Sequence, residues 1–306
     1  MFDCDLNSIK DNLKDVKNQG FNAIQISPLQ KTKDDYSKEW WMLYQPINFN
    51  LGNRIGSVDD LKRLCEEAHK YGLYIIADVV VNHLASLDNH GSLEAHPNCD
   101  KDILYNKDCF KEKRNITNWN DRYQVTHYCM GLPGLNPNNK IVQEKIINML
   151  NNYIECGVLG FRFDAAKSIA LPEEGCDFFK NITFSLKKWL PIIYGEVLFA
   201  DKELISKYAK YMKVLTNSDA YNNNDIIKFV ENKDSYLSKD MNYTRYTPIW
   251  EINAWYYSIC EHYPTHKANP GKLLHPGPRP LPWMDRQTGE RASHSCLPTQ
   301  DNSACL

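Results

Sequence analysis

The sequence predicts an α/β fold with a parallel sheet, and three observations support that prediction. The segment LYIIADVVV (73–81) is a nearly continuous apolar run, as expected for a strand buried on both faces. It follows an amphipathic helix that Ser57 caps and Gly72 ends. Helices and buried strands then alternate along the chain, which is typical of βαβ units.

Each element is predicted from the spacing of its apolar residues. Ile9, Leu13 and Val16 have helical spacing, whereas FNAIQISP (21–28) is a short apolar run typical of a buried strand. The predicted helices span 7–18, 57–72, 140–156, 173–189, 201–211 and 247–264. The predicted strands span 21–28, 73–81, 158–164, 192–197, 212–216 and 226–232.

Two segments interrupt this alternation. Residues 84–138 are polar and too long for an ordinary loop, so they predict a subdomain inserted after the third strand. Residues 266–306 contain no Ile, Val or Phe and predict a disordered tail. The main domain would then consist of residues 1–83 and 139–265.

Composition excludes several classes of protein. A formal net charge of −2 gives no basic face for nucleic acid, and no apolar run of eighteen residues predicts a membrane span. We expect a monomer. The first residues, MFDCDLNSIKD, lack the features of a signal peptide, which predicts a cytoplasmic chain as written. A lost N-terminus with an export signal would make the protein extracellular instead.

Ten cysteines form no paired CxxC zinc pattern. Cys99 and Cys109 lie in the inserted segment and could pair if the protein were secreted. We expect mostly buried, free thiols, and the redox compartment stays open.

Acidic residues stand at the ends of four predicted strands. They are Asp78 in DVVVNH, Asp164 in GFRFDAAKS, Glu196 in YGEV and Asp234 in FVENKD. One such residue is more often a helix cap, but the carboxyl ends of parallel barrel strands converge on one site. Four of them together therefore predict catalysis.

Glycoside hydrolysis requires such a set of acids. One carboxylate faces the anomeric carbon, and a second carboxyl protonates the leaving oxygen. Arg162 lies two residues before Asp164 on the same strand face, so it can hold that carboxylate ionised. Glu196 has apolar neighbours in the sequence, and partial desolvation would suit it to proton donation.

The four segments appear in the order of the signature regions of the α-amylase superfamily of retaining glycoside hydrolases, and they resemble those regions closely. The resemblance runs from about residue 2 to residue 263 and implies a (β/α)8 TIM barrel. It implies Asp164 as nucleophile, Glu196 as general acid/base and Asp234 as transition-state stabiliser. It further implies that Arg162 positions the nucleophile and that His83 contacts the sugar.

A further segment, WWMLYQP (40–46), resembles the part of the family in which aromatic rings stack on the glucan. The resemblance implies that Trp41 and Tyr44 stack on glucose units and that Gln45 hydrogen-bonds one. A plain aromatic core cluster is the alternative interpretation. The segment NRIGS (53–57) also resembles the amylase pattern, and together these favour α-1,4-glucan as substrate.

Two positions beside the acids depart from the family pattern. Lys233 replaces a sugar-contacting His and could instead pair with Asp234 or Glu196. Ser168 also replaces a His, whereas the neighbouring Lys167 is kept and is expected to contact substrate.

The resemblance leaves a bound calcium ion open. Asn82 matches a ligand asparagine, and backbone carbonyls near Ser168 could serve, because Ca²⁺ takes six to eight oxygen ligands. However, LPGLN has Gly134 where the family pattern has a ligand Asp.

Relative to the family, the chain looks truncated at both ends, because its first strand is short and no eighth strand follows residue 264. The barrel is thus expected to be incomplete at the C-terminus. Three functions stay open: a retaining endohydrolase of starch and maltooligosaccharides, a 4-α-glucanotransferase or α-glucosidase with the same triad, and a catalytically impaired glucan-binding remnant. All three bind an α-glucan.

Overall fold

The structure is a computed structural model that describes residues 1–215 except positions 19, 90, 191 and 199. Several predictions therefore lie outside the described residues. These are the strand 226–232, the helix 247–264, the tail 266–306, the incomplete C-terminus of the barrel, and the site residues Lys233 and Asp234.

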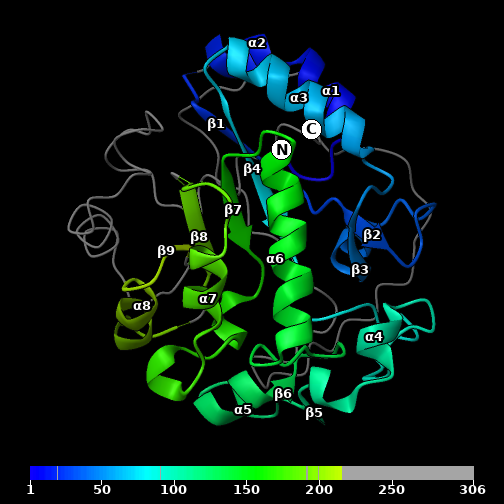
Figure 1. Ribbon diagram of the computed structural model, residues 1–306, viewed down its shortest axis with the longest axis vertical. Coiled ribbons are helices and arrows are strands. Elements are labelled where there is room, and N and C mark those ends of the chain that lie inside the picture. Colours follow the sequence, from blue (N-terminus) through cyan, green and yellow to red (C-terminus); the bar gives the residue numbers. More distant parts are fainter. Residues whose placement is uncertain (19, 90, 191, 199, 216–306) are drawn as a thin grey trace, which may run out of the picture.

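A five-stranded parallel sheet forms the centre of the molecule (Figure 1). Its strands are β1 Ala23–Ile26, β4 Tyr74–Val79, β7 Gly160–Phe163, β8 Ile192–Glu196 and β9 Lys213–Leu215. They lie side by side in chain order, and every neighbouring pair is parallel. Parallel strands in sequential order are the arrangement of a barrel wall, and the five predicted strands up to residue 216 are confirmed.

Helices connect these strands, and most of them match the predicted ranges. They are α1 Leu6–Asp11, α2 Leu13–Asn18, α3 Val58–Lys70, α6 Lys140–Glu155, α7 Phe178–Phe184 and α8 Lys202–Tyr208. Ser57 caps α3 in a capping box with Asp60, as the sequence indicates. No helix of the described part is long and apolar enough to cross a membrane.

Two helix predictions were wrong in detail. The segment 7–18 forms two helices, because the chain turns at Asn12, whose side chain donates to the Ser8 carbonyl. The segment 173–189 holds only a 3-10 turn, η4 (Pro172–Glu174), and the short α7. Gly175 ends η4 with a left-handed φ of 84°.

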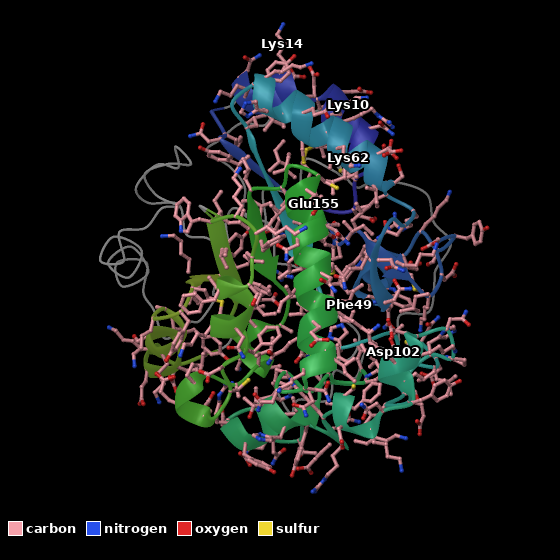
Figure 2. All side chains as sticks on the ribbon, viewed as in Figure 1. Lys10, Lys14, Phe49, Lys62, Asp102 and Glu155 are labelled. Carbon is pink, nitrogen blue, oxygen red and sulfur yellow. The ribbon has the colours of Figure 1, made fainter. Side chains whose placement is uncertain are left out.

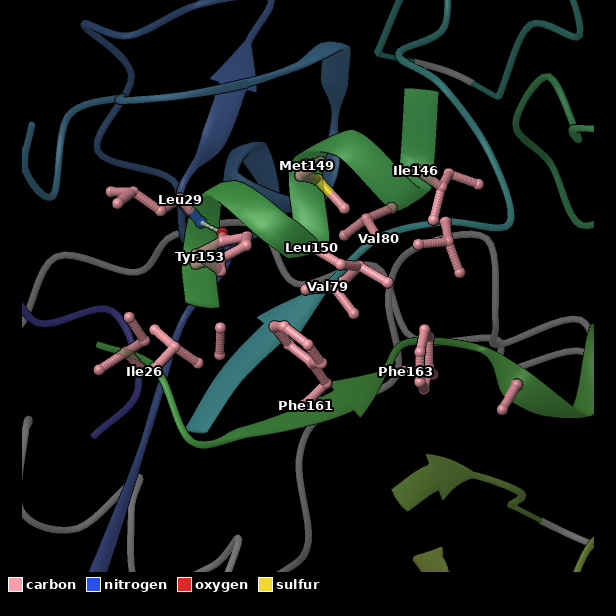
Figure 3. Close-up of a cluster of buried hydrophobic side chains, with 14 of the residues drawn as sticks. Ile26, Leu29, Val79, Val80, Ile146, Met149, Leu150, Tyr153, Phe161 and Phe163 are labelled. Atoms are coloured by element: carbon pink, nitrogen blue, oxygen red, sulfur yellow. Dashed lines mark hydrogen bonds between the residues drawn. The ribbon is translucent and has the colours of Figure 1, made fainter. Parts of the chain in front are cut away.

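The core lies between α6 and the sheet (Figure 3). Side chains of α6 pack on those of β4 and β7, and the cluster includes Ile146, Met149, Leu150, Val79 and Phe163. Tyr153 packs edge-on against Phe161, with ring centroids 6.0 Å apart, and its hydroxyl accepts a hydrogen bond from the Leu29 amide at 3.0 Å. Burying each such side chain stabilises the fold by about 1.5–3 kcal/mol.

The two ends of the molecule differ in character. Helices α1, α2 and α3 gather at one end, where Figure 2 shows Lys14 pointing away from the core. The β-strands run away from that end, so their carboxyl ends face the opposite one (Figure 1). At this far end lies most of the inserted segment.

Residues 84–138 follow the segment DVVVNH (78–83), which begins in β4, and contribute no strand to the five-stranded sheet. They form α4 Lys101–Leu104, η2 Lys107–Cys109, β5 Glu112–Asn115, α5 Arg122–His127 and β6 Tyr128–Cys129. Strands β5 and β6 pair in a small sheet of their own. Cys99 and Cys109 are both buried and free, so the expected thiols are present in this segment.

Candidate active site

Four charged side chains meet at the carboxyl ends of β4, β7 and β8. Asp78 is paired in register with Arg162 across β4 and β7, and Arg162 with Tyr194 across β7 and β8. Asp164 directly follows β7, and Glu196 is the last residue of β8. The parallel register therefore brings together residues that are far apart in sequence, as the sequence predicts.

Arg162 is the centre of this group. Its Nη1 donates to Asp78 Oδ1 at 2.7 Å, to Asp78 Oδ2 at 3.0 Å and to Asp164 Oδ1 at 2.8 Å. Its Nη2 lies 2.6 Å from Glu196 Oε1. One buried guanidinium thus holds three carboxyl groups, and it fixes the two predicted catalytic acids relative to each other.

The cluster contains more acid than base. Three ionised carboxylates, two of them buried, beside one guanidinium would leave a net charge of −2. Desolvation raises the pKa of Asp164 to about 8 and also raises the pKa of Asp78, while Arg162 opposes both shifts. The cluster therefore favours retention of a proton on Asp78 or Asp164 near neutral pH.

The backbone after Asp164 takes a conformation that is uncommon for a residue with a side chain. Ala165 has a left-handed φ of 49°, which costs about 1–3 kcal/mol. In this conformation its amide donates to Glu196 Oε2 at 3.0 Å. The turn thus ties the carboxyl group on β8 to the residue that follows β7.

Gly195 lets these two elements approach. A Cβ at this position would lie 2.7 Å from the Cβ of Ala166, which begins the 3-10 turn η3 (Ala166–Ser168). Any larger residue would push β8 away from η3 and would disturb the contact between Ala165 and Glu196.

Tyr44 and His83 form a chain of hydrogen bonds that leads away from Asp78. Tyr44, on the 3-10 turn η1 (Trp40–Tyr44), donates its hydroxyl proton to Asp78 Oδ2 at 2.7 Å. The His83 Nε2 lies 3.0 Å from the Tyr44 carbonyl, and burial lowers the pKa of His83 to about 4. The imidazole is therefore neutral and donates through Nε2, which leaves Nδ1 without a hydrogen-bond partner among the described residues.

At Tyr44 the aromatic segment matches the interpretation as a core cluster. Tyr44 is buried, and its ring contacts Phe2 and Trp40, as in a core cluster. Trp41 is half-buried on η1, and Gln45 is buried with its Oε1 accepting from the Ser86 amide at 3.0 Å. Stacking of Trp41 and Tyr44 on glucose and a hydrogen bond from Gln45 stay predictions.

Lys167 lies on η3, three residues beyond Asp164. Its Nζ is 5.8 Å from the centroid of the Trp119 ring in the inserted segment, and burial lowers its pKa to about 8. A contact between Lys167 and substrate stays a prediction. Neither Trp119 nor the hydrogen bond between Tyr44 and Asp78 was predicted from the sequence. The Asp that begins DVVVNH is the one sequence signal for that hydrogen bond.

The residues around Asn82 do not fit a calcium ion. Asn82 Oδ1 accepts a hydrogen bond from Lys111 Nζ at 2.7 Å, and the Ser168 carbonyl accepts from the same nitrogen at 2.6 Å. Among the described residues no group of three or more His, Cys, Asp or Glu could hold a metal ion. Both oxygens that the resemblance offered to calcium are thus bound to an amine.

Strand-end carboxyl groups on a parallel sheet define a class of site, that of an acid-catalysed hydrolase of the α/β barrel type. A model of the family described as alpha amylase, catalytic domain, matches residues 3–251. The chain belongs to the α-amylase family of glycoside hydrolases. Membership confirms the predicted (β/α)8 barrel, to which the described part contributes five parallel strands.

Relatives agree with this assignment. An alpha-amylase of Clostridium acetobutylicum is 40% identical over 228 residues, which are 70% of this chain and 29% of that protein. An alpha-amylase-related protein of Drosophila orena is 32% identical over 205 residues, or 62% of this chain and 41% of that protein. The chain therefore spans less than half the length of these relatives.

Solved structures show the same fold. The alpha-amylase of Geobacillus thermoleovorans, complexed with acarbose, has a TM-score of 0.55 and 28% identity. That match covers 68% of this chain and 44% of the other. Alpha-amylase I of Eisenia fetida, in a mutant complexed with maltohexaose, has a TM-score of 0.58 at 22% identity and covers 70% and 47% of the two chains.

Proposed function

We propose that the chain is the catalytic domain of a retaining endohydrolase that cleaves α-1,4-glucosidic bonds in starch and maltooligosaccharides. One observation carries the proposal: Asp164 and Glu196, on neighbouring strand ends, bind the two terminal nitrogens of the Arg162 guanidinium. This arrangement places two carboxyl groups on the same side of the sheet, as a retaining mechanism requires.

The contacts support a separate role for each acid. Among the described residues Asp164 is bound only through Oδ1, so its Oδ2 can attack the anomeric carbon. Glu196 then gives its proton to the departing glycosidic oxygen as the C–O bond breaks, which leaves a glycosyl ester on Asp164. In the second step Glu196 takes a proton from water, the water oxygen bonds to the anomeric carbon, and Asp164 is released.

The remaining functional residues act around this pair. Arg162 keeps Asp164 oriented and favours its ionised form. By family resemblance Asp234 stabilises the transition state, and His83, Lys167 and Lys233 contact the sugar. Support for a glucan substrate comes from the relatives, since the Geobacillus and Eisenia amylases are seen with acarbose and maltohexaose.

The test is hydrolysis of a blocked p-nitrophenyl maltoheptaoside by the purified chain and two variants. Asp164→Asn should lower kcat on the order of 10⁴-fold. Asp102→Asn, an exposed residue at the far side of the inserted segment (Figure 2), is the matched control and should keep full activity. A folded wild-type protein without turnover, or an active Asp164→Asn variant, would overturn the proposal.

The products distinguish the other members of the same class. Internal cuts give maltooligosaccharides, as proposed here. Products longer than the substrate would assign a 4-α-glucanotransferase, and glucose released from chain ends would assign an α-glucosidase. Binding of maltoheptaose without turnover would assign a glucan-binding remnant.

A further inference from the structure

Lys111 is a buried cation outside the acidic cluster. It directly precedes β5 in the inserted segment and is only 8% exposed. Its backbone amide donates to the Gly134 carbonyl at 2.8 Å. Its side chain extends out of the inserted segment towards the barrel, where Nζ reaches two oxygens.

These two oxygens belong to different strand ends. Asn82 follows β4 and offers Oδ1 at 2.7 Å, and Ser168 ends η3 after β7 and offers its carbonyl at 2.6 Å. The amide of Asn82 is held in this orientation because its Nδ2 donates to the sulfur of Met130 at 3.3 Å. One amino group therefore connects the inserted segment to the ends of β4 and β7.

We propose that the side-chain amino group of Lys111 takes the place of a structural calcium ion and fixes the inserted segment to the barrel without a metal. The N–O distances are a few tenths of an ångström longer than Ca²⁺–oxygen distances, so the nitrogen lies close to where an ion bound by the same oxygens would lie. The inference concerns the stability of the fold and does not depend on the proposed activity.

The absence of a side chain at Gly134 is a second observation that supports the replacement. A Cβ at this position would lie 2.9 Å from Cδ and 3.4 Å from Cβ and Cγ of Lys111. An Asp at position 134 and the observed path of the Lys111 side chain therefore exclude each other. We therefore treat the absence of a carboxylate at position 134 and the presence of the Lys111 amine as one combined replacement of the calcium site.

The charge of the two acceptor groups also favours an amine over a calcium ion at this place. Both acceptors are neutral, which leaves too little negative charge for a divalent ion but suits an amine with two or three N–H donors. Burial lowers the pKa of Lys111 to about 7. A neutral amine still has two N–H donors, one for each oxygen, so the connection holds in either protonation state.

The test measures thermal unfolding of the full chain by calorimetry, with calcium or with EDTA. The wild-type Tm should be the same in both within about 1 °C, because no ion contributes to the folded state. A rise in Tm with calcium that is lost in Asn82→Leu would overturn the proposal. This comparison requires no variant of Lys111.

Two lysines of the same segment provide a matched pair of variants. Lys111→Met should lower the Tm by roughly 5 °C, because it leaves two buried oxygens without a donor. Lys113→Met removes an exposed lysine of β5 that pairs with Glu94, and should leave the Tm unchanged. Equal Tm values for the two variants would contradict the role of Lys111.

Discussion

Two buried cations, Arg162 and Lys111, lie near the carboxyl ends of the strands, and they have opposite surroundings. Arg162 contacts three carboxyl groups, from Asp78, Asp164 and Glu196. Lys111 Nζ binds two neutral oxygens and, within the described part of the chain, no carboxylate. The first arrangement concentrates surplus negative charge where proton transfer is proposed, whereas the second only connects parts of the chain. The two cations are similarly buried, but Arg162 belongs to the proposed catalytic site, whereas Lys111 connects the inserted segment to the barrel.

The difference has an energetic consequence. When one partner of a buried ion pair is removed, the remaining charge is left without compensation, whereas a lost neutral hydrogen bond leaves only unsatisfied oxygens. Removing Arg162 should therefore destabilise the fold more than removing Lys111.

The largest effect is expected for Arg162→Met. It removes the cation that holds the buried Asp78 and Asp164 and the half-buried Glu196, and should lower the free energy of unfolding by about 3–5 kcal/mol. Lys111→Met should lower it by about 1–3 kcal/mol. Urea denaturation at pH 7 measures both values. The comparison fails if the lysine variant is the less stable one.

The next effect concerns His83 and acid. Its folded-state pKa of about 4 lies below the ordinary value of 6.5 because the ring is fully buried. Since the unfolded chain binds a proton first as the pH falls, stability is full above pH 6.5 and decreases towards pH 4, by roughly 3 kcal/mol. His83→Gln should remove this part of the pH dependence. Denaturation curves at pH 7 and pH 4.5 should then differ less in the variant than in the wild type.

At Asp164 we expect a smaller effect of pH on stability, and stability changes with pH in the opposite direction. Its pKa is raised to about 8 by burial, so the folded state holds its proton more tightly than the unfolded state. The carboxylate therefore costs stability increasingly as the pH rises from about 4 to about 8. Asp164→Asn should raise the Tm at pH 8 by at least about 2 °C, and by less at pH 5. A Tm that falls at both pH values would show that Arg162 fully compensates the carboxylate.

The strands and the acids at their ends could be predicted from the sequence, for one physical reason. A parallel strand buried on both faces reads as a continuous apolar run, so residues 73–81 indicated β4, and the acids were found where such runs end. The helix predicted at 173–189 was wrong because apolar spacing continues past the packed part, where Phe184 and Trp189 are 81% and 80% exposed. Local spacing does not show which side chains will reach the core.

Lys111 shows the limit of sequence reasoning more clearly. It lies 29 residues from Asn82 and 57 from Ser168, in a polar segment without periodicity. The family pattern marked Asn82 and the unusual Gly134, but neither position indicates which side chain replaces the missing carboxylate. That information is in the path of the inserted segment, which tertiary contacts determine.

The last and smallest effect follows from this exchange. In the double variant Lys111→Ala/Gly134→Asp the amine is removed and a carboxylate is introduced next to the path that the Lys111 side chain follows. Calcium should then raise the Tm by about 2 °C, because an ion that binds only the folded state stabilises it. Lys111→Ala/Gly134→Asn is the control: it removes the amine but adds no carboxylate, and it should show no response to calcium. If the first double variant also gives the same Tm with calcium and with EDTA, the amino group and the ion do not share one position. That outcome would contradict the proposal that the Lys111 amine replaces a calcium ion.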